Sequence, residues 1–337
     1  MKKYKTSIFT GMRVTSGMHI ANLIGAINPI LDILNDSSFG RPMIFVADIH
    51  SLTTDEVKDT QKNVISVLKD YIAAGLDPDK VDLFIQSQII DEISRMSLYL
   101  SRLVTVSELL RIPTLKEKIR HGQSEMTAKN LLVLYPVMMA ADILLQGAEY
   151  VPVGKDQYPH MEMTCEMVRR FNKKYGKVFF EPKSLIQGNP INILSLTGNG
   201  KKMGKTDPNG AIILSDDIDI SLKKIKKAKT AFAGEMNDNL KSLKMIADYV
   251  ANDEERKEFD RLIKEHIDGK QVMGEFKKLL MISMERFLKD FQAKKAEIDD
   301  DCVLKLTEKG AEKARKNAQE VLKEMENAMG MKYVRSL

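Results

Sequence analysis

The chain has 337 residues, with 43% hydrophobic and 29% charged side chains and a formal net charge of +5, a length that suits two domains, or one large domain with an appendage. Its two cysteines, Cys165 and Cys302, lie far apart and form no CxxC pair, which argues against a disulfide framework and against a zinc site built from paired cysteines. The first residues do not form a signal peptide and no apolar run approaches the roughly 18–20 residues that cross a bilayer, so we expect a cytoplasmic protein with no membrane partner.

Short apolar runs alternate with longer amphipathic stretches in the first part of the chain. We expect four strands, at residues 6–11, 42–50, 81–88 and 148–154. Helical spacing follows the first two strands, and Gly75 can end the second helix. Continuous β-rich runs between helices indicate a parallel sheet covered on both faces, and therefore a doubly wound α/β fold. Ligands of such sheets bind beyond the carboxyl ends of the strands, which directs attention to the loops after Phe9, Ala47 and Val153.

The character of the chain changes after about residue 217. Strand patterns fade, proline vanishes and Lys-rich helical patterns take over, which predicts an α/β domain over residues 1–217 and a helical domain over residues 218–337. A last helix over residues 308–330 would end at Gly330, and we expect it to pack back on the first domain. The mildly basic charge is compatible with an RNA partner.

The stretch "FTGMRVTSGMHIAN" (residues 9–22) leaves a strand and enters a helix near His19. Backbone N–H groups at a helix start carry partial positive charge and can bind an anion. His19 and Asn22 lie three residues apart on one helical face, so they could donate hydrogen bonds to phosphate oxygens together. An ordinary glycine turn with a surface histidine explains the same pattern equally well.

The stretch "GNGKKMGKTDPNG" (residues 198–210) combines three lysines with four glycines. Clustered cations repel each other, so such a loop suits a polyanion that arrives to meet it. Lys202 and Lys205 can act as point charges against a phosphate chain. The stretch is not a Walker A loop, because Asn199 stands where that pattern requires a glycine. A solvated surface turn is the alternative.

The stretch "LYPVMMAADILLQGAEYVPVGKDQ" (residues 134–157) predicts a helix with Pro136 in its first turn. Three residues share one face of this helix: Tyr135, Met139 and Asp142. A carboxylate among apolar side chains is costly unless a donor meets it. Asp142 therefore predicts either a pocket for a flat apolar ligand with one N–H group, or a carboxylate satisfied by a backbone N–H group or an arginine. The strand that follows this helix would bring Asp156 and Gln157 to the entrance of the same pocket.

Together and in this order, these stretches resemble the tryptophanyl-tRNA synthetases, class I enzymes with a Rossmann-like doubly wound parallel sheet and a C-terminal helical domain. "HIAN" (residues 19–22) resembles their HIGH motif, and "KMGKT" (residues 202–206) resembles their KMSKS motif. "AADILL" (residues 140–145) and "VPVGKDQ" (residues 151–157) resemble the tryptophan-pocket helix and the strand and loop that follow it. This pair favours tryptophan over tyrosine, and the likeness covers most of the chain.

The resemblance implies a tryptophan–tRNA ligase. Such an enzyme uses ATP to convert L-tryptophan to tryptophanyl-AMP and pyrophosphate, and then transfers the amino acid to the terminal ribose of tRNA(Trp). Mg²⁺ would accompany ATP, held by phosphate oxygens and water and not by protein ligands. The resemblance also implies anticodon binding by the helical domain and a homodimer, with no role for DNA.

The resemblance also implies roles for individual residues. The implied catalytic residues are Lys202, Lys205, His19, Asn22 and Lys118. The implied ATP site consists of Arg13, Val14, Thr15, Ala21, Asn22, Gly154, Lys155, Asp156, Ile193, Leu194, Lys202, Met203, Gly204, Lys205 and Thr206. The implied tryptophan pocket consists of Asp142, which would accept the indole N–H, and of Tyr135, Met139, Phe9, Gly11, His50, Val151, Val153 and Gln157.

The chain departs from the family pattern at a few positions: Ala21 for glycine, Gly204 and Thr206 for serines, Lys155 for an acidic residue, and Arg13 for glutamine. We expect activity with altered ATP contacts, because the lysines and Asp142 are kept. Some relatives hold an iron–sulfur cluster in the helical domain, but two distant cysteines cannot supply its four usual ligands.

Three alternatives remain open. A tyrosyl enzyme of the same class would want hydrogen-bond partners for a phenol, whereas here one aspartate lies beside methionines. A small-molecule nucleotidylyltransferase would share the HIGH-type loop but has no need of a long basic helical domain. A non-catalytic synthetase-like module could bind RNA through residues 223–229, although such a lysine run is more often a solvated helix face.

Overall fold

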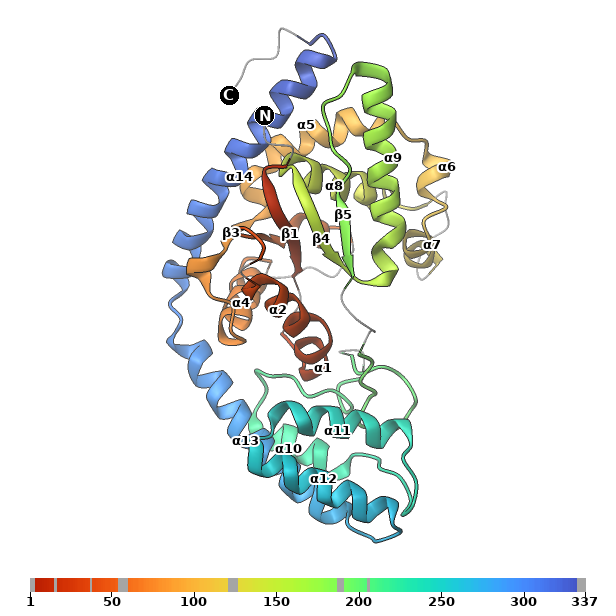
Figure 1. Ribbon diagram of the computed structural model, residues 1–337, viewed down its shortest axis with the longest axis vertical. Coiled ribbons are helices and arrows are strands. Elements are labelled where there is room, and N and C mark those ends of the chain that lie inside the picture. Colours follow the sequence, from red (N-terminus) through yellow and green to blue (C-terminus); the bar gives the residue numbers. More distant parts are fainter. Residues whose placement is uncertain are drawn as a thin grey trace.

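The protein is described from a computed structural model that covers residues 4–14, 17–36, 38–53, 60–120, 127–186, 191–204 and 207–331. Its centre is a five-stranded parallel sheet in the order β3-β2-β1-β4-β5 (Figure 1). The strands are β1 (Thr6–Arg13), β2 (Met43–Ala47), β3 (Asp82–Ile85), β4 (Ala148–Val153) and β5 (Lys183–Ile186). The doubly wound parallel fold expected from the sequence is therefore confirmed, and β5 is an additional strand.

Buried side chains cover both faces of the sheet. Neighbouring residues on a strand point to opposite faces, so one strand can contribute to two buried clusters. Ile8 and Ile44 belong to one buried cluster, whereas their neighbours Phe9 and Phe45 belong to another. The helices of this part are α1 (Ile20–Asn22), α2 (Asn28–Asn35), α3 (Asp48–Ser51), α4 (Thr60–Ala73), α5 (Ile90–Ser101), α6 (Val106–Leu109), α7 (Pro113–Arg120), α8 (Asn130–Leu145) and α9 (Tyr158–Tyr175). A π-helical segment, Leu23–Ile27, joins α1 to α2, and short 3₁₀ turns occupy Pro78–Lys80, Gln86–Ile89 and Lys155–Gln157.

Several local predictions are wrong. The second strand was expected to reach residue 50 but ends at Ala47, because residues 48–51 turn into α3. The third strand was expected to reach residue 88 but ends at Ile85, where a 3₁₀ turn begins. The last helix was expected over residues 308–330 but already begins at Asp300.

Pro136 was expected in the first turn of its helix but lies inside α8, which begins at Asn130. A proline there removes one helical hydrogen bond, and α8 tolerates this because most of its side chains are buried and packing against its neighbours stabilises it.

A group of helices follows the sheet and lies at one end of the molecule (Figure 1). It consists of α10 (Ile218–Lys227), α11 (Asp238–Val250), α12 (Asp253–Ile267) and α13 (Met273–Glu297). The chain then returns along the side of the sheet in α14 (Asp300–Ala328), which packs on β3. A Cβ atom at Gly310 would lie 2.0 Å from the carbonyl oxygen of Leu83, so only glycine allows α14 to approach the strand this closely.

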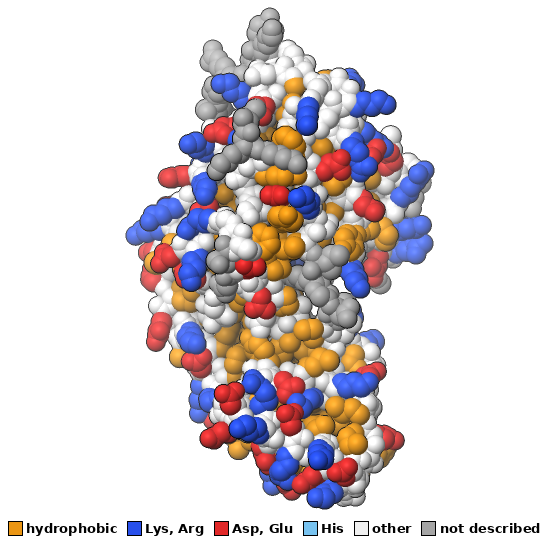
Figure 2. All heavy atoms as spheres, in the orientation of Figure 1, with side chains coloured by type: hydrophobic (Ala, Val, Ile, Leu, Met, Phe, Trp, Pro, Cys, Tyr) orange, Lys and Arg blue, Asp and Glu red, His pale blue; other side chains and the backbone are white. Residues whose placement is uncertain are grey.

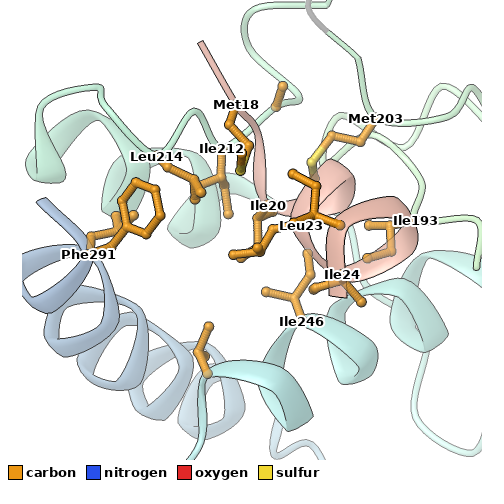
Figure 3. Packing of buried hydrophobic residues seen from close by; sticks show 14 of the residues in the cluster. Met18, Ile20, Leu23, Ile24, Ile193, Met203, Ile212, Leu214, Ile246 and Phe291 are labelled. Carbon is orange, nitrogen blue, oxygen red and sulfur yellow. The ribbon is translucent and has the colours of Figure 1, made fainter. Parts of the chain in front are cut away.

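One buried cluster joins the sheet to the helical group. Side chains that follow β1, such as Ile20 and Leu23, share this cluster with Ile246 of α11 and Phe291 of α13 (Figure 3). On the face of the molecule that Figure 2 shows, apolar side chains gather along the middle, while most charged side chains lie towards the edges and over the helical end. In the part of the chain that the structure describes, we find no helix that combines the length and the apolar character needed to span a membrane.

Candidate active site

A cavity of about 840 Å³ lies at the carboxyl ends of β1, β2 and β4. The strands β1 and β4 are neighbours although more than 100 residues separate them, and β2 pairs with the other side of β1. The chain order therefore reverses at this point, which is where open α/β sheets bind ligands. All nine residues predicted for the tryptophan pocket line this cavity: Phe9, Gly11, His50, Tyr135, Met139, Asp142, Val151, Val153 and Gln157.

Asp142 lies on α8 at the cavity wall and is only 4% exposed. Gln86 Nε2 donates to both carboxylate oxygens, at 3.0 and 2.8 Å, and His50 Nε2 lies 3.0 Å from Oδ2. Burial raises the pKa of Asp142, and the hydrogen bonds from His50 and Gln86 oppose that shift. Two side chains therefore satisfy this carboxylate, in place of the backbone N–H group or arginine considered from the sequence.

Gln86 was missed in the sequence and is fully buried. Its amide oxygen accepts a hydrogen bond of 3.3 Å from the backbone N–H of His50, while its amide nitrogen donates to Asp142. The amide is thus oriented from both sides. A polar residue directly after the apolar β3 was the available signal, because strand ends in such sheets carry the site.

A second buried network surrounds Tyr135. Its hydroxyl lies 3.2 Å from Thr114 Oγ1 and 3.1 Å from His160 Nε2, and the last two atoms are 2.7 Å apart. Burial, helped by the charge of Lys118, lowers the pKa of His160 to about 4, so the imidazole is neutral at physiological pH. Lys118 Nζ lies 4.2 Å from the centroid of the Tyr135 ring, and burial followed by repulsion from Arg13 lowers the pKa of Lys118. The sequence offered no signal for Thr114 or His160.

The segment predicted to resemble the HIGH motif begins α1. His19 is the N-cap of this helix, and its Nδ1 accepts a hydrogen bond of 3.2 Å from the backbone N–H of Asn22. The two residues therefore bond to each other locally, and His19 is mostly buried at 7% exposure. Neither they nor Ala21 are among the described residues that line the cavity, whereas Arg13, Val14 and Lys118 are.

Lys202 and Met203, in the segment predicted to resemble the KMSKS motif, lie on one side of a short hairpin. Lys202 pairs with Leu194 in an antiparallel bridge, and Met203 N–H donates to the Ile193 carbonyl oxygen at 2.8 Å. Lys202 is exposed, whereas Ile193 and Met203 are buried among apolar side chains (Figure 3). None of these residues is among the described residues that line the cavity.

Of the remaining residues predicted for the ATP site, some line the cavity and others do not. Gly154 and Asp156 line the cavity, whereas Lys155 and Gly204 are not among its described lining residues. Three of the predicted residues lie outside the described residues: Thr15, Lys205 and Thr206.

The segment that resembles the HIGH motif is hydrogen-bonded to residues 212–214, which follow the hairpin that contains Lys202. Ile20 N–H donates to the Ile212 carbonyl oxygen at 2.9 Å, and Leu214 N–H donates to the Met18 carbonyl oxygen at 2.8 Å. The side chains of the same two segments also belong to one buried cluster: Met18, Ile20, Ile212 and Leu214 (Figure 3). Residues almost 200 positions apart in the sequence thus lie on adjacent segments.

Comparison with known proteins agrees with this architecture. Residues 1–289 match the family described as class I tRNA synthetases for W and Y. The chain is 35% identical over 336 residues to the tryptophan–tRNA ligase of Porphyromonas gingivalis, covering 97% of this chain and 99% of the relative. It is 36% identical to that of Streptococcus agalactiae (98% and 99% covered) and 32% identical to that of Bacillus subtilis (97% and 98% covered). The chain belongs to the tryptophan–tRNA ligase family.

Solved structures of tryptophan–tRNA ligases share the whole fold. The structure from Campylobacter jejuni complexed with ADP and tryptophan is 26% identical, has a TM-score of 0.82, and matches 96% of this chain and 99% of that one. The structure from Mycoplasma pneumoniae is also 26% identical, with a TM-score of 0.80, and matches 97% and 98% of the two chains. The similarity therefore includes the helical group and α14 as well as the sheet.

Proposed function

We propose that this protein is a tryptophan–tRNA ligase that activates L-tryptophan with ATP and transfers it to tRNA(Trp). The observation that carries this proposal is a single buried carboxylate, Asp142, in the wall of the cavity at the switch point of the sheet. The reaction serves protein synthesis, so the proposed location is the cytoplasm. We also keep the proposed division at residue 217, with tRNA anticodon binding assigned to the helical group.

In the proposed tryptophan pocket, Asp142 accepts the indole N–H. Gln86 and His50 hold the carboxylate in place before the substrate arrives, so little reorganisation is needed on binding. A ring without an N–H donor would leave part of this buried carboxylate unpaired, which is costly. The other proposed pocket residues are Phe9, Gly11, Tyr135, Met139, Val151, Val153 and Gln157.

In the proposed first step, an oxygen of the tryptophan carboxylate attacks the α-phosphorus of ATP. The bond from this phosphorus to the bridging oxygen breaks, and pyrophosphate leaves with the bond electrons. Lys202, Lys205 and Lys118 would stabilise the growing negative charge, and His19 and Asn22 would hold phosphate oxygens. The other proposed ATP-site residues are Arg13, Val14, Thr15, Ala21, Gly154, Lys155, Asp156, Ile193, Leu194, Met203, Gly204 and Thr206.

In the second step, a hydroxyl of the terminal ribose of tRNA attacks the tryptophanyl carbonyl carbon. The bond to the adenylate oxygen breaks and AMP leaves, while the hydroxyl proton is released. No bond to the protein forms in either step, so catalysis consists of positioning and charge stabilisation. The cationic side chains around the cavity, Arg13 and Lys118, suit a triphosphate that brings Mg²⁺ on its own oxygens.

We further propose a homodimer. Three exposed apolar side chains on packed neighbouring helices support an interface there: Leu98 of α5, Val106 of α6 and Leu134 of α8 are 71%, 59% and 41% exposed. Large exposed patches of apolar side chains mark protein interfaces, and we propose that these three helices carry one. Light scattering on the purified protein, compared with a Leu98→Glu variant, tests this assembly.

ATP–pyrophosphate exchange measured with tryptophan and with tyrosine tests the function. We expect exchange that depends on tryptophan, with tyrosine a far weaker substrate. Exchange that prefers tyrosine would indicate the tyrosyl enzyme. Exchange with neither amino acid would contradict the proposal and favour a non-catalytic RNA-binding module.

A further inference from the structure

Asp207 lies directly behind the segment of residues 202–206 and binds back to the turn that precedes it. Its Oδ2 accepts three side-chain hydrogen bonds: from Ser195 Oγ at 2.5 Å, from Asn199 Nδ2 at 2.9 Å and from Thr197 Oγ1 at 3.0 Å. One oxygen thus collects donors from three alternate positions of the preceding turn. Hydrogen bonds to a charged acceptor are stronger than neutral ones, so this cluster stabilises one arrangement of the turn.

The segment before Lys202 is held from the other side by the backbone. Ser195 N–H donates to the Lys201 carbonyl oxygen at 2.9 Å, and Leu194 pairs with Lys202 across the hairpin. Leu194 N–H also donates to Ser242 Oγ of α11 at 3.0 Å, which attaches the hairpin to the helical group. The residues that lead into the segment of residues 202–206 are therefore held in place by hydrogen bonds.

The exit from the lysine segment is equally close to this turn. Leu196 N–H donates to the Gly210 carbonyl oxygen at 3.0 Å, and Gly210 N–H donates to the Asp207 carbonyl oxygen at 3.0 Å. A Cβ atom at position 210 would lie 1.8 Å from Ser195 Oγ. Only glycine leaves room for Ser195 to reach the Asp207 carboxylate, so backbone and carboxylate belong to one closed arrangement.

The Asp207 carboxylate keeps its charge at physiological pH. The hydrogen bond from Ser195, followed by those from Thr197 and Asn199, lowers the pKa of this group, although partial burial opposes them. Both ends of the lysine segment are therefore fastened to the same turn at residues 195–199. Lys202, the lysine of this segment that the structure describes, therefore has few ways to be displaced.

We propose that Asp207 is a positioning residue that acts through Ser195, Thr197 and Asn199 to aim Lys202, in the segment of residues 202–206, at the triphosphate. This role rests on the proposed function, because it needs a nucleotide at that segment. Asp207 does not touch the reacting atoms. It raises the rate by holding charges where they meet the phosphate oxygens in the transition state, and so it should affect kcat more than tryptophan binding.

The experiment compares Asp207→Ala and Asp207→Asn with the unaltered protein in tryptophan-dependent ATP–pyrophosphate exchange. We expect Asp207→Ala to lower kcat by about 10- to 100-fold, because small misplacements of catalytic groups have effects of this size. The KM for tryptophan should stay within about twofold, since this substrate binds in the other half of the site. Asp207→Asn, which keeps one acceptor oxygen, should lose less. The control is Asp290→Asn, which removes an exposed carboxylate paired with Lys294 on α13, and it should leave both constants unchanged.

A double-mutant cycle with Lys202→Ala separates positioning from a general structural role. If Asp207 acts through the lysine segment, Asp207→Ala should cost clearly less in the Lys202→Ala background than in the unaltered protein. The same loss in both backgrounds, or an unchanged kcat in Asp207→Ala, would overturn the proposal. If Asp207→Ala does not fold, Asn199→Ala removes one donor at an exposed position and should lower kcat in the same direction, whereas an unchanged kcat there would overturn it as well.

Failure of the proposed function gives a different result. The unaltered protein would then show no tryptophan-dependent exchange, and both proposals would fall together. Normal exchange in the unaltered protein with no effect of Asp207→Ala would remove only the role of Asp207.

Discussion

Asp142 and Lys202, the residues proposed for the two halves of the reaction, lie in opposite surroundings. Asp142 is 4% exposed, lies on a buried helix and receives hydrogen bonds from two side chains of neighbouring strand ends. Lys202 is exposed on a hairpin that belongs to neither the sheet nor a helix. The half proposed to select the substrate is preorganised in the core, whereas the half proposed to handle the triphosphate is carried by a surface segment fastened at its ends. Selection benefits from rigidity, while a segment that admits and releases ATP benefits from exposure.

The contrast between the two halves would fail if the exposed segment of residues 202–206 did not affect the rate of the chemical step. Lys205→Ala should slow adenylate formation by about 100- to 1000-fold, because removing one group that stabilises transition-state charge has this effect. Pre-steady-state measurement of pyrophosphate release gives the rate, and equilibrium tryptophan binding should change little. Lys201→Ala in the same loop is the matched control. An unchanged chemical step would contradict the role assigned to this loop.

The buried half is tested by Asp142→Asn, which keeps the shape of the side chain and removes its charge. The KM for tryptophan should rise by about 10- to 100-fold, since hydrogen bonds to charged groups contribute about 1.5–3 kcal/mol. The preference for tryptophan over tyrosine should fall, while kcat should fall less. Steady-state exchange kinetics with both amino acids measure this. A large loss of kcat with an unchanged KM for tryptophan would assign Asp142 to the chemical step instead.

The pH dependence of stability sharpens the contrast, because His160 belongs to the buried half. Its pKa is lowered from 6.5 to about 4 in the folded protein, so the unfolded chain binds more protons between these values. This contribution to stability is present above about pH 6.5 and is lost as the pH falls towards 4. The free energy of unfolding should fall by about 2 to 3 kcal/mol from this group between pH 7 and pH 4.5.

Urea unfolding at several pH values measures this effect, with His160→Gln as the comparison. The variant should show a clearly weaker dependence on pH over the same range, since the remaining acidic groups are common to both proteins. Identical pH profiles would mean that His160 is not buried in its neutral form.

The smallest expected effect concerns the attachment of the hairpin to the helical group. Ser242 Oγ accepts a hydrogen bond from Leu194 N–H and donates to the Asp238 carbonyl oxygen. Ser242→Ala removes this buried acceptor and should lower the free energy of unfolding by about 1 to 2 kcal/mol. The kcat of exchange should fall only a few-fold, because the bonds of the hairpin itself remain. Thermal unfolding and exchange kinetics test both statements, and a loss of kcat as large as that of Lys205→Ala would contradict them.

Much of the fold was predictable because its signals are local. The apolar runs at β1, β2, β3 and β4 and the helical spacing after residue 217 are periodic patterns in adjacent residues. The placement of Pro136 failed because local preference favours a helix start, while burial along α8 decided otherwise. The strand β5 was missed because its sequence, KSLI, has only two apolar residues, whereas the equally short β3, DLFI, has three in a row.

The candidate site was predictable only in part. Asp142 stood out as a charge in an apolar helix, and lysines in a glycine-rich loop stood out by composition. The partners of Asp142 could not be read in the same way, because Gln86 lies 56 positions away and meets it only across the sheet. The same holds for His160 and Thr114 around Tyr135.

The sequence by itself determined the parallel α/β architecture, the helical C-terminal part and the segments proposed to carry the chemistry, because periodicity and residue type act over a few neighbouring positions. The tertiary structure decided which donors satisfy Asp142, how residues 18–20 meet residues 212–214, and how Asp207 closes on the turn before the lysines. These contacts depend on strand order and close packing, which bring distant residues within hydrogen-bond distance and leave no local trace in the chain.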